Sequence, residues 1–437
     1  MSFEAYEKGK EEMVEESPSE TIVEMEDKRY IGAHIWNPDI DIRWRYGIPA
    51  FIVLNVIFLT IADVASGVVA TTTIIDRQQG VIFDEIVILS VSIVTSLREL
   101  WNAGSQALAV FICITSLLLP YFKLILMMVA WVTPMKTRKG REHFIQILDA
   151  ISKWSFVDIF VLVIIMVAFR STIITQDVVG IEVYILPQWG FYAFVFANML
   201  SLVGSQFILR IHRNVQYEQS EVKQNSPSSK EDVEELKESK ADQSEIIKTS
   251  ISSEAGISKI LLILLFFVYA SMHFVGCWIQ IYQVTNTRGS DVLTKDYSIF
   301  SLGNDIPLTV HHPSDFGVRW MQFMFFIITV VLPVCNIFTC TFLYLYPMTR
   351  SLQKIIFFIA EILYSWSASE VIALSVVFSV LQIPKFGNGL IKGGCTECYV
   401  VNSTLYAEFS ILCISAVLNM AINFWMLMRA HKCIYPK

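Results

Sequence analysis

The stretch LLLPYFKLILMMVAWVTPM, residues 117–135, decides the fold of this chain. It is almost continuously apolar, and a helix of roughly 20 such residues crosses the roughly 30 Å of hydrocarbon in a bilayer. A second stretch, TVVLPVCNIFTCTFLYLYPM at residues 329–348, has the same layout: two prolines fourteen residues apart, the second followed by methionine. The two stretches predict equivalent membrane helices, one in each half of the chain.

The composition extends this interpretation to the whole chain. Of the 437 residues, 54% are hydrophobic and only 17% are charged, a balance that favours a membrane protein over a soluble domain. Helices satisfy every backbone hydrogen-bonding group within the span, as hydrocarbon requires. We therefore predict an all-α polytopic membrane protein with eight transmembrane helices. The apolar runs that predict them are 47–70, 106–132, 155–175, 189–211, 257–283, 319–345, 367–384 and 405–428.

The two halves correspond residue by residue, at an offset that stays between 212 and 214. Four helices return the chain to its starting side, so both halves have the same orientation. This predicts two tandem parallel four-helix repeats, related by a pseudo-twofold axis along the membrane normal. The offset pairs Pro120 with Pro333, Lys123 with Asn336, Trp154 with Trp366, Asp158 with Glu370 and Arg170 with Gln382.

Polar segments divide the chain into five parts. An acidic tail with a pre-membrane segment precedes the first repeat, a Ser/Glu/Lys-rich linker separates the repeats, and a short tail ends the chain. The composition of the acidic tail and of the linker predicts disorder. The five ranges are 1–45, 46–213, 214–256, 257–430 and 431–437.

Loop charge predicts the orientation. Loop 133–153 carries five Lys or Arg residues, whereas loop 176–188 carries none. Because positively charged loops stay on the cytoplasmic side, both termini and the linker are expected in the cytoplasm. The loops expected to face outward, or into a lumen, are 71–105, 176–188, 284–318 and 385–404.

Asp158 and Glu370 stand at the start of equivalent apolar runs, each four residues after a tryptophan. One interpretation is a helix cap in cytoplasmic water, stabilised by the helix dipole and flanked by an anchoring tryptophan. The other is a carboxylate that faces the bundle interior and carries a proton. The sequence leaves both interpretations open.

Lys123 lies about nine residues, or roughly 14 Å, from the cytoplasmic end of its helix. Because a charge at this depth costs at least about 2.5 kcal/mol, we expect Lys123 to line a polar cavity. The spacing places Asp158 nearer the cytoplasmic mouth and predicts a water-linked path between the two. Pro120 and Pro333 are expected to kink their helices. Further polar candidates for the path are Asn55, Asp63, Asn336, Glu370, Gln382 and Arg170, although Arg170 could instead reach only lipid headgroups.

The outward loop 385–404 carries two further features. Cys395 and Cys398 could form a disulfide in an oxidising lumen or remain free thiols, and Asn402 begins a glycosylation sequon. A four-ligand zinc site would need a second cysteine pair. We expect no metal and no cofactor. The sequence shows no hydrolase triad, P-loop or dinucleotide fingerprint and no basic stripe, so we expect neither an enzyme nor a nucleic-acid-binding protein.

Four motifs follow one another within residues 95–172: Leu-Trp-x-x-Gly at 100–104, Pro-Tyr-x-Lys at 120–123, Pro-Met at 134–135 and Trp-Ser-x-x-Asp-x-Phe at 154–160. This series resembles the paraquat-inducible protein A family of integral membrane proteins, and the second half resembles it in outline. Bacterial members carry Cys-x-x-Cys zinc ribbons before each helical half. Because this chain has no cysteine before Cys113, the resemblance implies a eukaryotic member without the ribbons.

The resemblance implies transport of lipid between membranes, with the proton gradient as a possible energy source. We predict a lipid transporter or lipid-loading protein whose partners are membrane lipids and an outward tunnel or shuttle protein. A membrane sensor or scaffold that binds partners through the tail and linker is one alternative, and an ion or proton channel is another. Lys123 favours a lined pathway, because an anchor gains nothing from a buried charge. Asp158→Asn and Lys123→Met are expected to impair transfer more than Glu370→Gln, whose half has Asn336 in place of a lysine.

The orientation can be tested with cysteines introduced at positions 140 and 396 and labelled from each side of the membrane. Position 140 lies in the basic loop and position 396 in the outward loop. We expect labelling from opposite sides. Labelling of both positions from one side would contradict the predicted arrangement.

Overall fold

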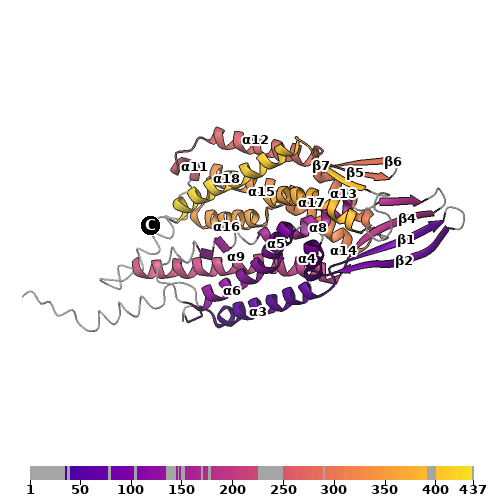
Figure 1. Cartoon of the computed structure of the whole chain (residues 1–437). Helices are drawn as coiled ribbons and strands as arrows, with labels where there is room; N and C mark the ends of the chain where they lie inside the picture. Colours follow the sequence, from indigo (N-terminus) through magenta and orange to yellow (C-terminus); the bar gives the residue numbers. More distant parts are fainter. Residues whose placement is uncertain are drawn as a thin grey trace, which may run out of the picture.

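The helices of the computed structural model form an elongated body, with the strands gathered at one end and the C-terminus at the other (Figure 1). Three of the predicted site residues, Arg170, Cys395 and Cys398, lie outside the described residues. The structure describes residues 35–36, 40–76, 80–102, 106–133, 144–145, 147–148, 153–168, 171–175, 179–224, 250–288, 291–310, 312–390 and 400–435.

Seven helical stretches among the described residues are long and apolar enough to cross a membrane. The protein is therefore a mostly helical, multi-pass integral membrane protein. Two of the seven stretches combine α-helices with a π-helical turn, and one combines two α-helices. Their helices are α3 (Ile42–Val64); α5 (Gln106–Ile112), η1 (Cys113–Leu118) and α6 (Leu119–Val132); α9 (Trp189–Gln224); α12 (Lys259–Trp278); α14 (Phe316–Phe326), η4 (Ile327–Val331) and α15 (Leu332–Leu345); α16 (Arg350–Trp366) and α17 (Ser369–Leu390); and α18 (Phe409–Ile434).

The predicted span at 155–175 contains no helix long enough to cross a membrane. It contains α8 (Val157–Ala168), a helix of 12 residues that follows a short 3-10 turn, η2 (Lys153–Phe156). At 1.5 Å per residue α8 is about 18 Å long, too short to cross the hydrocarbon alone. The segment after it forms strand β3 (Ser171–Thr175), so the apolar run contains both a helix and a strand.

The equivalent segment of the second half is a broken helix. The segment 346–366, which lies between the predicted spans 319–345 and 367–384, contains α16, and α17 begins after a break at Ser367 and Ala368. The Trp-Ser motif therefore marks a break between two helical pieces in the second half and the 3-10 turn before α8 in the first. Asp158 and Glu370 are each the second residue of the helix that follows.

Both predicted proline irregularities take the form of a π-helical turn. The turn η1 ends two residues before Pro120, and η4 ends two residues before Pro333. Proline has no N–H to donate to the preceding turn, so the helix widens there. The same device occurs at equivalent positions of the two halves.

Two antiparallel sheets are present that the sequence does not predict, and their strands lie mostly in the segments expected as outward loops. One has the order β2-β1-β4-β3 and the other the order β6-β5-β7. In each, the strand after the first span of its half pairs with the strand before the last span, so those two spans are held side by side. Asn402 is exposed in β7, opposite Thr285 of β5. The strands are β1 (Val68–Asp76), β2 (Gly80–Val91), β3, β4 (Val179–Pro187), β5 (Tyr282–Arg288), β6 (Asp291–Tyr297) and β7 (Val400–Leu405).

Strand composition explains both the sheets and the missed prediction. The stretch VVATTTIID of β1 is almost entirely β-branched, a composition that favours strands. Valine and isoleucine are as apolar as the residues of a membrane helix, so hydropathy alone does not separate a span from the start of the strand that continues it. Short helices complete the fold: α4 (Ile93–Asn102), α11 (Ile251–Glu254), α13 (Ile299–Asp305) and the 3-10 turn η3 (Ile306–Thr309).

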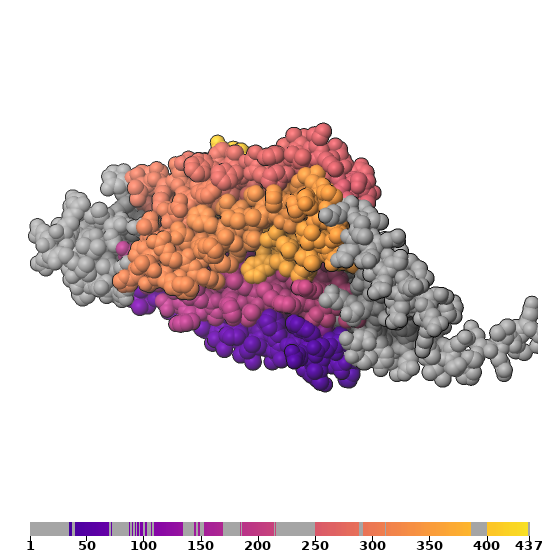
Figure 2. Space-filling view, turned by 180° about the vertical axis from the view of Figure 1, so that it is seen from behind, coloured from indigo at the N-terminus to yellow at the C-terminus, as the bar shows by residue number. Residues whose placement is uncertain are grey.

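The two halves pack along their whole length. Seen from behind, the magenta surface of α9 lies between indigo α3 and the orange helices of the second half (Figure 2). Helix α9 continues to Gln224, eleven residues past the predicted start of the linker, so residues 214–224 are helical rather than disordered. Residues 225–249 of the linker and most of the acidic tail lie outside the described residues.

A glycine at the start of α9 provides a test of this packing. A Cβ at Gly190 would lie 2.7 Å from the carbonyl oxygen of Ser66 and 2.8 Å from that of Ala65. Backbone cannot move aside as a side chain can, so Gly190→Ala is expected to destabilise the protein by about 1–3 kcal/mol. The measurement is thermal unfolding in detergent. The matched control is Gly47→Ala in α3, where a Cβ meets nothing within 4 Å; equal melting temperatures for the two variants would contradict the packing.

Candidate functional site

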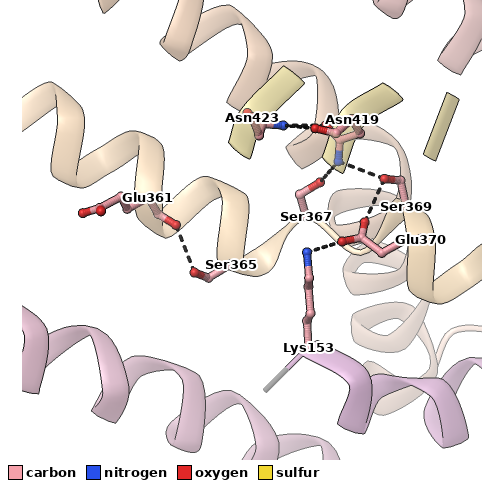
Figure 3. A network of polar contacts seen from close by, with 8 residues as sticks. All are labelled: Lys153, Glu361, Ser365, Ser367, Ser369, Glu370, Asn419 and Asn423. Atoms are coloured by element: carbon pink, nitrogen blue, oxygen red, sulfur yellow. Dashed lines mark hydrogen bonds and ion pairs between the residues drawn. The ribbon is translucent and has the colours of Figure 1, made fainter. Parts of the chain in front are cut away.

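A buried ion pair joins the two halves. The Lys153 ammonium of η2 donates to the Glu370 carboxylate of α17, and their side chains are 5% and 10% exposed (Figure 3). The same ammonium lies 4.2 Å from the centre of the Tyr364 ring. The two charged residues come from positions 217 residues apart in the chain. The pair therefore exists only when the halves are docked.

A chain of hydrogen bonds continues from Glu370 into the second half (Figure 3). Ser369 donates to the other carboxylate oxygen at 3.2 Å. The Asn419 amide in turn donates to Ser369 at 3.0 Å and to Ser367 at 3.2 Å, and the Asn423 amide donates to the Asn419 side-chain oxygen at 2.8 Å. Asn419 is the eleventh of 26 residues in α18, so the chain lies near the middle of that helix.

The chain of polar groups extends to α15. The Cys340 thiol lies 3.6 Å from the Asn423 side-chain oxygen and 3.9 Å from that of Asn336. Asn336 is fully buried, and its amide nitrogen has no hydrogen-bond partner among the described residues. Polar groups thus run from the boundary between the halves into the interior of the second half.

A second ion pair crosses between the halves nearer the end opposite the sheets. Both guanidinium nitrogens of Arg213 in α9 donate to the Glu361 carboxylate of α16, the longer bond at 2.8 Å. The Phe357 ring lies 5.5 Å from the guanidinium carbon. Arg213 and Glu361 are 8% and 14% exposed, so a bidentate buried pair fixes the register of the two helices.

Asp63 and Asp158, the two candidate acids of the first half, interact with each other and with neutral side chains. The Tyr121 hydroxyl of α6 donates to the Asp63 carboxylate of α3 at 2.8 Å. Asp158 of α8 lies beside Ser116, and its charge interacts with that of Asp63. One Asp63 oxygen and the Ser116 hydroxyl are buried without a hydrogen-bond partner among the described residues. The charges of these two carboxylates repel when both are ionised.

Lys123 occupies a different place from the one expected. Its ammonium donates to the carbonyl oxygen of Ser201 in α9 at 2.8 Å, and the residue is 3% exposed. It is deeply buried, as predicted. The predicted depth order is wrong, however, because Asp158 lies beside Ser116, which is seven residues or about 10 Å nearer the end that carries the sheets than Lys123 is, along the same helical stretch. Asp158 starts α8 at a break, and the sequence analysis took that start for the cytoplasmic threshold.

The remaining candidates for the polar path, Asn55 and Gln382, are also buried. Asn55 is 1% exposed and Gln382 is 3% exposed. Both side-chain atoms of Asn55 and the amide nitrogen of Gln382 have no partner among the described residues. Trp154 and Trp366 are partly buried and pack against the core, and their role as anchors stays a prediction. No group of three His, Cys, Asp or Glu side chains suited to a metal ion occurs in the described part of the chain.

Several residues of the site were missed from the sequence. Lys153 was counted only as one of the charges of the basic loop, because a helix break cannot be read from hydropathy. The sequence of the second half does indicate a buried polar network, because small polar residues recur inside its apolar spans at helical spacing. They are Ser367, Ser369, Ser375, Ser379, Asn419 and Asn423, all fully buried.

A further contact joins the two halves beside the ion pair. Ser375 of α17 donates to the carbonyl oxygen of Val157 at 3.1 Å, so α17 and α8 are also joined directly. The acids at the starts of these two helices are stabilised by the helix dipoles. A change of charge at either acid therefore acts on the contact between the halves.

Comparison with known proteins found a family match within the first half of the chain. Residues 87–208 match the model of the paraquat-inducible protein A family. The expected resemblance is confirmed over this region, which runs from β2 into α9. The paraquat-inducible protein A match includes Lys123, Lys153 and Asp158, and it ends before Arg213. No curated protein and no solved structure matched the chain.

The buried pair predicts a strong coupling between Lys153 and Glu370. Lys153→Met leaves a buried carboxylate without its partner and is expected to cost about 3–5 kcal/mol of stability. Adding Glu370→Gln should restore part of that loss, because no unpaired charge remains. The measurement is a double-mutant cycle on thermal unfolding in detergent.

The control is the pair of Arg350 with Glu254 at 3.0 Å, whose side chains are 38% and 27% exposed. Arg350→Gln should cost at most about 1 kcal/mol, because exposed pairs are screened by water. Additive effects of the two changes at Lys153 and Glu370 would argue against the pair.

Proposed function

We propose that this protein moves or loads lipid between the membrane and a partner, with its two halves shifting against each other at the Lys153–Glu370 ion pair. The observation that carries the proposal is this pair at the boundary between the halves, continued by buried polar groups. The paraquat-inducible protein A match over residues 87–208 supports it. Buried charge inside a membrane is costly and marks a pathway more often than an anchor.

Proton coupling follows from the chemistry of the carboxylates. A proton on Glu370 would remove the charge that holds Lys153 and would weaken the contact between the halves. A proton shared by Asp63 and Asp158 would relieve their repulsion in the first half. Protonation of Glu370 and protonation of the Asp63–Asp158 pair would both act on the contact between α8 and α17. Either event would therefore shift the equilibrium between two arrangements of the halves.

The architecture proposed with this function has two tandem parallel repeats. Both halves place a π-helical turn before an equivalent proline, an acid at the second residue of a half-helix, and a sheet that joins the first and last spans. With α8 as the short member of the third pair, the spans number eight. Positive loops support cytoplasmic termini, and the sheets then face outward.

The outward partner in this proposal is a lipid-carrying tunnel or shuttle protein. Both sheets lie at the end of the molecule opposite the C-terminus (Figure 1). Strands β2, β3 and β6 are edges within their sheets, and an unpaired strand edge is a surface to which another chain can add.

A proton channel is the second candidate, favoured by the acids and amides alone. Asp63, Asp158 and Glu370 together with the Asn419–Asn423 chain could conduct protons without moving lipid. Lipid transfer and proton flux must therefore be measured on the same vesicles.

We expect Glu370→Gln and Asp158→Asn each to slow lipid transfer between vesicles by about tenfold, the effect of about 1.4 kcal/mol on a rate-limiting step. Because the structure gives Glu370 a lysine from the other half, its variant should be affected at least as strongly as Asp158→Asn. This reverses the order expected from the sequence. The control is Glu254→Gln, which removes an acid of an exposed pair.

Fluorescent phospholipid and a pH dye inside the vesicles report transfer and proton flux together. Wild-type transfer by both variants would refute the assigned role of the acids. Proton flux without lipid transfer in the unmodified protein would favour the channel.

A further inference from the structure

A groove of about 470 Å³ opens between α3, α6 and α9, at the end of the first half that lies away from the sheets. This volume falls in the range of about 300–1,000 Å³ that holds small molecules. Its walls are almost entirely apolar, and the two charged residues of its lining, Asp41 and Arg43, stand together at the start of α3. The groove is thus apolar along its length and polar at one end.

The length of the groove matches one leaflet of a bilayer. On α3 its lining runs from Asp41 to Ile52, which is about 16 Å at 1.5 Å per residue. Half of a hydrocarbon core of about 30 Å is about 15 Å. Exposed Trp44 and Tyr46 lie at the polar end, and such residues mark the level of the headgroups.

Glycines and aromatic rings of α3 and α9 shape the walls of the groove. Phe51 lies against α9, where a Cβ at Gly204 would be 2.7 Å from its ring, so the glycine admits the ring and the groove forms beside it. Trp44 and Phe207 stack at 5.9 Å across the two helices. At Gly47 a Cβ would meet nothing within 4 Å, so none of the described residues fills the space at the polar end.

We propose that this groove binds one acyl chain of an anionic phospholipid from the surrounding leaflet, with the phosphate beside Arg43. Both long walls belong to helices that are long and apolar enough to cross a membrane, so a lipid chain is what the groove meets. Arg43 is exposed, and the Asp41 carboxylate beside it accepts from the backbone N–H of Arg43 at 3.1 Å. The guanidinium of Arg43 is therefore the group that faces a headgroup. The binding of lipid in this groove does not depend on the proposed function. Only the role of the groove in lipid transfer rests on that function.

The test is photo-crosslinking in nanodiscs of phosphatidylcholine that contain a small fraction of phosphatidylglycerol with a diazirine in its acyl chain. Adducts are located by peptide mass spectrometry on the purified full chain. We expect adducts on residues 41–52 and 204–208. Gly47→Phe should reduce them by about tenfold, because the ring fills space that is open in the unmodified protein.

Ile57→Phe is the matched control, since Ile57 is 50% exposed on the same helix and does not line the groove. Its adducts should equal those of the unmodified protein. Arg43→Gln should remove the preference for diazirine phosphatidylglycerol over diazirine phosphatidylcholine. If Gly47→Phe does not fold, Gly47→Leu takes its place.

The absence of groove adducts in the unmodified protein, or equal adducts in Gly47→Phe and Ile57→Phe, would overturn the proposal. So would equal labelling by the two lipids. These outcomes are independent of lipid transfer: transfer without groove adducts overturns only the groove, and groove adducts without transfer overturn only the proposed function.

Discussion

The structure depends on the constraint that charge inside a membrane must be paired. Lys153 and Glu370 are almost fully buried and come from different halves of the chain. Neither half could keep its charge in hydrocarbon alone, because an unpaired buried charge costs several kcal/mol. The pair therefore fixes how α8 meets α17, and the Arg213–Glu361 pair repeats the constraint between α9 and α16. Apolar packing alone would allow these helices to slide past each other.

The broken third helix is what brings the acids to this boundary. A continuous helix would have no free N–H groups at mid-membrane, whereas α8 and α17 each begin beside their acid. The first-turn N–H groups and the helix dipole stabilise a carboxylate there. The positions of Asp158 and Glu370 agree with the cap interpretation in part, and proton transfer by these acids stays a prediction. The acids do stand at helix starts, and those starts lie inside the protein rather than in cytoplasmic water.

The sequence predicted what depends on local composition and missed what depends on contacts between distant segments. The seven long spans follow from apolar runs, and the buried positions of Lys123, Asn55 and Asp63 follow from their places within those runs. Lys153 could not be assigned to Glu370, because Asp149 and Asp158 are both within five residues of it in the sequence and the pairing with Glu370 arises only when the halves dock. The sheets were missed because β-branched strands and apolar helices have the same hydropathy.

The halves have similar plans but unequal charge, and that inequality bears on the energy source. Lys123 and Lys153 both belong to the first half. Lys153 pairs with Glu370 of the second half, and Lys123 donates to the backbone carbonyl of Ser201. Asp63 and Asp158 are left to each other. Among these five residues there are three acids and two lysines, so full ionisation leaves one uncompensated negative charge in a medium that does not tolerate it. A single proton on the Asp63–Asp158 pair removes that charge. In the proposed function, the binding of one proton would therefore shift the arrangement of the halves, as a proton-driven lipid transporter requires.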